Sequence, residues 1–128
     1  MKVLIRCALC ALLVSGCASA GGRRAPAVDR DRITAEQLAR VPADNAYEAI
    51  RNLQPQWLEG RGPASVTDPT PATAVVYVDG NRVGDLETLR SFSLTSLSEI
   101  RYHPPGQASS RFGMGLPRGV IELISKGR

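Results

Sequence analysis

The spacing of apolar and polar positions after residue 33 predicts a small domain that combines helices with strands. The clearest helical segment has apolar residues at three- and four-residue intervals, which places one face in a core, at Ala46, Ala49, Ile50 and Leu53. Asp44 precedes this segment and is a residue type that caps helix N-termini, and Pro55 follows it. The pattern therefore predicts a helix that begins after Asp44 and ends before Pro55.

Two further helices are expected on either side of this one. Thr34 followed three residues later by Gln37 is a capping box, and Val41-Pro42 stops the short helix that it starts. Asp85 is a candidate N-cap for a helix that carries Leu86 and Leu89. Trp57 is expected to pack back on the core between these helices.

A hairpin is predicted in the middle of the chain. Residues 75–78 are β-branched or aromatic, and Asp79-Gly80 after them is a preferred pair for a tight turn into residues 81–83. Gly80 supplies the positive φ that such a turn needs, so the pair has a structural role without any ligand.

Two more strands follow the hairpin. Residues 98–103 alternate and are stopped by Pro104-Pro105, and residues 120–125 form an apolar strand. The order of the elements predicts an α+β domain, with a small mixed β-sheet and two main helices, over residues 33–128.

Two segments between these elements are expected to be loops. Residues 59–73 are rich in Gly, Pro, Ser and Thr, and a loop of this length is either functional or only flexible. Residues 106–118 form the second expected loop, and they carry Arg111 and Phe112, our two candidate binding residues. The alternative for Phe112 is a core position beside the turn at Gly113.

The first sixteen residues have a different character, that of a secretory signal peptide. Lys2 and Arg6 precede an uncharged stretch over residues 7–14, and small residues follow. Eight apolar residues are too few for a membrane span, which needs about 20. Residues 1–16 are therefore expected to be removed, and residues 17–32 are expected to form a flexible tether.

The segment Val14-Ser15-Gly16-Cys17 resembles the lipobox of bacterial lipoproteins. The resemblance implies cleavage before Cys17, and acylation of this cysteine with diacylglycerol and an amide-linked chain such as palmitate. Two or three acyl chains anchor a protein durably, whereas one anchors it marginally. Ala18 after the cysteine implies, by the sorting habit of this family, a place on the outer membrane with the domain facing the periplasm. The alternative is an ordinary signal peptide with a chance cysteine.

Composition leaves little material for catalysis. The chain of 128 residues has three cysteines and one histidine, and Cys7 and Cys10 fall in the segment that is removed. His103 precedes two prolines and has no nucleophile motif near it in sequence, so we expect a surface residue at the end of a strand. No spacing suggests a metal site or a cofactor site, and glycines 113, 115 and 119 lack the pattern of a dinucleotide loop. We expect no enzyme activity.

The charge of the chain gives no indication of nucleic-acid binding. Sixteen basic and twelve acidic residues give +4, and removal of Lys2 and Arg6 leaves fourteen against twelve, or +2. The arginines are scattered and are not interleaved with aromatic residues. We therefore expect no nucleic-acid partner.

Five segments of the expected mature domain follow one another in an order that has a known counterpart. They are the helix of residues 46–53, V-V-Y-V-D-G at 75–80, L-S-E-I-R-Y at 97–102, S-R-F-G at 110–113 and G-V-I-E-L-I-S-K at 119–126. In this order they resemble the plug domain of TonB-dependent outer-membrane receptors, and the resemblance covers residues 44–126. The resemblance implies structural roles for Asp79, Gly80, Gly113 and Gly119.

The chain departs from this family where the receptor's barrel would begin, since the sequence stops at Arg128. Transport by this chain alone is therefore not expected, and Arg118 stands where the family has the first of two glycines. We expect a non-enzymatic lipoprotein whose plug-like domain binds an outer-membrane barrel protein, another envelope protein or a ligand, as an accessory to TonB-dependent uptake. The alternative is a structural or assembly lipoprotein without a ligand.

Overall fold

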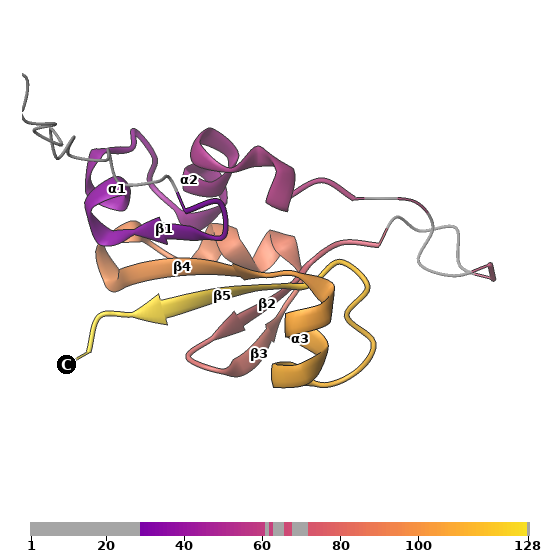
Figure 1. Ribbon diagram of the computed structural model, residues 1–128. Helices are drawn as coiled ribbons and strands as arrows, with labels where there is room; N and C mark the ends of the chain where they lie inside the picture. The colour runs from indigo at the N-terminus through magenta and orange to yellow at the C-terminus, as the bar shows by residue number, and fades with distance from the viewer. Residues whose placement is uncertain (1–28, 61, 63–65, 68–71, 128) are drawn as a thin grey trace, which may run out of the picture.

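The computed structural model describes residues 29–60, 62, 66–67 and 72–127. These residues form an α+β fold around one mixed sheet of five strands, as the sequence predicts (Figure 1). The strands are β1 (Arg32–Thr34), β2 (Val75–Val78), β3 (Asn81–Gly84), β4 (Leu97–His103) and β5 (Val120–Ser125). The predicted signal peptide and most of the predicted tether, including Cys17, lie outside the described residues.

The strands lie in the order β1-β4-β5-β2-β3. Three neighbouring pairs are antiparallel, and β2 with β5 is parallel. The strand that comes last in the described chain therefore lies at the centre of the sheet, between β4 and β2. Strand β1 was not predicted; it pairs with β4 and starts within the segment expected to be the tether.

The helices are α1 (Ala35–Arg40), α2 (Ala46–Leu53) and α3 (Pro105–Phe112), with 3₁₀ helices η1 (Pro55–Trp57), η2 (Leu86–Ser91) and η3 (Leu94–Ser96). One face of the sheet carries the main core, to which α1, α2 and η2 contribute Leu38, Ile50 and Leu89. The opposite face carries a smaller core beneath α3, in which Ala108 packs with Tyr77 and Val120.

The capping box of α1 and the apolar face of α2 are confirmed. Thr34 Oγ1 accepts a hydrogen bond from Gln37 N, and Gln37 Oε1 accepts one from Thr34 N. The prediction that Asp44 caps α2 is wrong by one residue. The cap is Asn45, whose Oδ1 accepts a hydrogen bond from Glu48 N.

Two other predictions on local structure are corrected. The segment after Asp85 is the 3₁₀ helix η2 and not an α-helix, and Asp85 makes no side-chain capping bond to it. Residues 106–118 are not one loop, since α3 takes up residues 105–112. Pro104-Pro105 ends β4 and also starts this helix, because a proline at the first helical position has no hydrogen bond to lose.

The predicted hairpin of β2 and β3 is confirmed. Asp79 and Gly80 have φ values of 47° and 83°, as a turn that matches the strand twist requires. Gly119 at the start of β5 has a φ of 76°, and a Cβ there would lie 2.2 Å from the carbonyl oxygen of His103. Position 119 therefore requires glycine, because the backbone at the end of β4 passes too close to leave room for a side chain.

Candidate functional site

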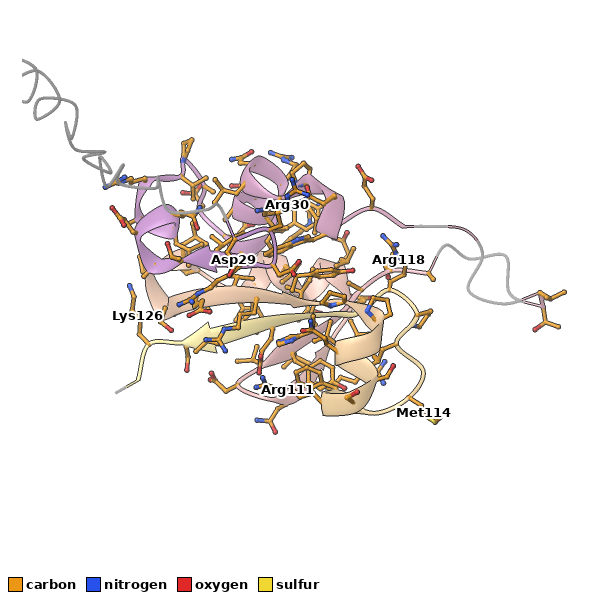
Figure 2. All side chains as sticks on the ribbon, viewed as in Figure 1. Asp29, Arg30, Arg111, Met114, Arg118 and Lys126 are labelled. Carbon is orange, nitrogen blue, oxygen red and sulfur yellow. The ribbon has the colours of Figure 1, made fainter. Side chains whose placement is uncertain are left out.

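A polar pocket lies beside the end of β4 where the two predicted loops meet. Its volume is about 390 Å³, within the size range of small-ligand sites. The long segment after residue 58 contributes Glu59 and Gly60, and the segment after α3 contributes Arg118. Arg30, Asp31, Gln56, Trp57 and Tyr102 complete the lining. In Figure 2 Arg118 lies at the base of the long loop, on the α2 side of the sheet.

The wall of the pocket is a stacked aromatic pair. The rings of Trp57 on η1 and Tyr102 on β4 are 5.5 Å apart between centroids and 17° from parallel. Trp57 Nε1 donates to the carbonyl oxygen of Arg30 at 3.1 Å, and Tyr102 Oη donates to that of Arg118 at 3.0 Å. The aromatic pair therefore fixes the backbone of both arginines that line the pocket.

Arg118 joins the two loop segments. Its Nη2 donates to the carbonyl oxygen of Glu59 at 2.5 Å, across 59 residues of sequence. Its Nε is buried and has no hydrogen-bond partner among the described residues. The ion pairs of the described residues include neither Arg118 nor Arg30. The pocket thus has two guanidinium groups without a carboxylate partner.

A second polar cluster lies beneath α3 and contains the predicted residue Arg111. Glu122 on β5 is 2% exposed, and its carboxylate lies 2.9 Å from Nε2 of His103 and 3.2 Å from Nη2 of Arg111. The expectation that His103 is a surface residue is wrong, because its ring is buried against Glu122 and the edge of Phe112. The buried carboxylate is paired on both oxygens, which satisfies its hydrogen bonds.

Phe112 packs on the smaller core, the alternative that the sequence left open. Its ring centroid lies 4.5 Å from that of Tyr77 and 5.3 Å from that of His103. The guanidinium group of Arg111 also points inward, to the buried carboxylate of Glu122, although the Arg111 side chain as a whole is 53% exposed. Both residues therefore have intramolecular roles that explain their positions, while a binding role for either stays a prediction.

The structure does not bring the other motif residues into the pocket. Asp79 lies at the hairpin turn and accepts two hydrogen bonds from Ser125. Gly113 ends α3 with a φ of 96°. The predicted turn residues are therefore placed away from the pocket, and Cys17 lies outside the described residues.

The described residues contain no group of three His, Cys, Asp or Glu side chains that could hold a metal ion. No helix in this part of the chain has the length and apolar character to cross a membrane. The buried His103 contacts a carboxylate and an aromatic ring, and the hydroxyls of Ser109 and Ser110 donate hydrogen bonds to backbone carbonyls of their own helix.

The sequence indicated the two segments that border the pocket, but it did not indicate the residues that line it. The prediction that Trp57 packs on the core is confirmed, since it is 3% exposed, and its place at the pocket was not foreseen. Tyr102 was expected only as part of a strand. The only signal for Arg118 was its place where the plug family has a glycine. Comparison with known proteins finds no family model that matches the chain, no similar curated protein and no similar solved structure.

Proposed function

We propose that this chain is a non-enzymatic binding module of the bacterial cell envelope. Lipid on Cys17 anchors the protein to the outer membrane, with its domain facing the periplasm. The domain binds an envelope partner or ligand in the pocket beside β4. A role as an accessory to TonB-dependent uptake is consistent with the resemblance of its segments to receptor plug domains.

The observation that carries this proposal is the hydrogen bond from Arg118 to the carbonyl oxygen of Glu59. It brings the two segments expected to bind a partner to one pocket of about 390 Å³. Its volume lies within the range of small-ligand pockets, and its lining joins an aromatic side chain to charged groups that can orient a ligand. The charged groups beneath α3, in contrast, are paired with one another.

Site-specific photocrosslinking of the lipidated protein in intact cells tests this function. A benzophenone amino acid replaces the exposed Gln56 at the pocket, or the exposed Arg82 on the far edge strand β3 as the control. We expect one crosslinked product of defined mass from position 56 that is absent from position 82. The same products at both positions, or none at position 56, would contradict the proposal.

The second candidate function is a structural or assembly lipoprotein without a ligand. It is favoured by the inward contacts of Arg111 and Phe112, which account for both residues by packing alone. Changes at these residues that lower the melting temperature and leave the crosslink at position 56 intact would fit packing roles. Loss of the crosslink at an unchanged melting temperature would instead place them in the binding surface.

Anchoring has a test of its own. The intact mass of the mature protein is expected to equal residues 17–128 plus two or three acyl chains, and Cys17→Ala is expected to leave the precursor uncleaved. A mature chain that is not acylated, or that begins at another residue, would contradict the lipoprotein assignment.

A further inference from the structure

Two N–H donors of Arg118, at Nε and Nη2, lie on one edge of its guanidinium group, and only Nη2 has an acceptor among the described residues. Nε and Nη2 share the edge with which arginine holds a carboxylate by two parallel hydrogen bonds. Here Nη2 donates to the carbonyl oxygen of Glu59, and Nε beside it is buried without a partner. A buried charged donor without an acceptor is destabilising, so this edge is incomplete in the free protein.

We propose that the pocket binds the terminal carboxylate of a ligand on the Nε and Nη2 edge of Arg118. This inference rests on the proposed function, since it names the ligand class of the same pocket. The two carboxylate oxygens satisfy both donors, whereas the backbone carbonyl of Glu59 satisfies one. The ligand therefore takes the place of this carbonyl at Nη2, while Trp57 and Tyr102 continue to hold the backbones of Arg30 and Arg118 at the pocket.

The remaining charges in the pocket define the ligand further. Asp31 and Glu59 line the same pocket as Arg30 and Arg118, so the four side chains sum to zero. The two carboxylates of the pocket repel a dianion such as phosphate, and its two guanidinium groups repel a simple cation. A monoanionic carboxylate matches this arrangement best, because it engages one arginine and leaves the other charges hydrated.

The aromatic wall supplies the second element of recognition. Trp57 is 3% exposed, so its ring supports the wall from behind, and Tyr102 is partly exposed at the pocket. An apolar group next to the carboxylate can lie against this wall. The shared chemistry is therefore a carboxylate on a short apolar body, which a small organic acid or the carboxyl end of a peptide both present.

Binding of matched probes to the mature lipidated protein in detergent tests the inference. The probes are N-acetyl-glycyl-phenylalanine, its C-terminal amide, and benzoate, each followed by calorimetry. We expect the free acid to bind about tenfold or more tightly than the amide, since each charge-assisted hydrogen bond contributes roughly that factor. Binding by benzoate as well assigns the site to small acids, and binding by the dipeptide alone assigns it to peptide ends.

Arg118→Lys is the diagnostic variant, because lysine keeps the charge and loses the two-donor edge. We expect it to weaken binding of the free acid about tenfold and to leave the amide unchanged, with Arg82→Lys on β3 as the control. An acid and amide that bind equally, no binding of either, or an Arg118→Lys variant that equals the parent protein, would overturn the carboxylate assignment.

The experiments distinguish failure of the proposed envelope-binding function from failure of the proposed carboxylate ligand. A crosslink specific to position 56 together with equal binding of acid and amide would leave the pocket as a binding site and reject its ligand class. Absence of that crosslink together with tight, Arg118-dependent binding of the acid would retain the carboxylate site and reject the envelope partner.

Discussion

The carboxylate of Asp79 accepts two hydrogen bonds from Ser125, which lies 46 residues further along the chain. Oδ1 accepts from Ser125 N at 3.0 Å and Oδ2 from Ser125 Oγ at 2.6 Å. The turn of the β2–β3 hairpin is thereby tied to the end of β5. A residue expected to serve the turn alone therefore also fixes the register of the central parallel pair.

The Asp79 carboxyl is expected to make stability depend on pH at acid values. Hydrogen bonds from the side chain and backbone of Ser125 hold the pKa of Asp79 below its ordinary value of 3.8. A lowered pKa in the folded state contributes stability above pH 3.8, and this contribution is lost as the pH falls through the folded pKa. The site is exposed, so we expect an effect below about 1 kcal/mol.

Urea unfolding of the parent protein and Asp79→Asn at pH 6 and pH 2.5 measures this effect. Asparagine can still accept one hydrogen bond but cannot titrate, so the difference between the two proteins is expected to shrink at the lower pH. Ser125→Ala is expected to remove most of the same pH dependence. A difference that grows on acidification would contradict the assignment.

Gly119→Ala is expected to destabilise the domain by about 3 kcal/mol or more. The new Cβ would lie 2.2 Å from the backbone oxygen of His103, and the residue would keep a φ of 76° that alanine rarely adopts. Gly106→Ala in α3 is the matched control, since a Cβ there has no atom within 4 Å. Chemical unfolding of both variants should show a loss for the first and no loss for the second, where alanine suits the helix better.

Glu122→Ala is expected to cost about 3 kcal/mol, as removal of one member of a buried ionic cluster does. It leaves His103 beneath α3 without its hydrogen-bond acceptor and Arg111 without its ion pair. Glu87→Ala removes the partner of Arg90 in an exposed pair, and it should change stability by less than about 0.5 kcal/mol. Thermal unfolding compares the two variants, and equal losses would argue against a stabilising role for the cluster.

Asn45→Ala is expected to destabilise the protein by about 1 kcal/mol, the usual cost of a lost N-cap. Asp44→Ala should cost less, because the carboxylate of Asp44 makes no capping bond to α2. Far-ultraviolet dichroism with urea titration measures both. A larger loss for Asp44→Ala would contradict the assignment of the cap.

Local chemistry accounts for what could be predicted of the fold. The Asp79-Gly80 turn needs two positive φ values, and Asp-Gly is a favoured pair for them. At α2 the neighbours Asp44 and Asn45 are both good caps, and the sequence does not decide between them. Asn45 also forms a β-bridge with Ser93, a contact from a distant segment that places its backbone outside the helix.

The start of α3 shows how one signal can have two readings. Pro104-Pro105 correctly predicted the end of β4, and the same feature hid the helix that follows. The helix has a weak sequence signal, because serines such as Ser109 and Ser110 can hydrogen-bond to nearby backbone groups in non-helical conformations. In the structure both hydroxyls donate to backbone carbonyls one turn earlier, at Pro105 and Gly106.

The polar sites depend on contacts that no local pattern contains. His103 meets Glu122 because the antiparallel register pairs His103 with Val120 and Arg101 with Glu122. Arg118 meets Glu59 across 59 residues. Residue types along the chain indicated both segments of the pocket, but their meeting follows from the strand order.

The central position of β5 also determines when this domain can fold. Both of its neighbours, β2 and β4, precede it in the chain, and neither can complete its pairing until residues 120–125 have left the ribosome. During synthesis the growing polypeptide therefore lacks the strand around which its sheet assembles.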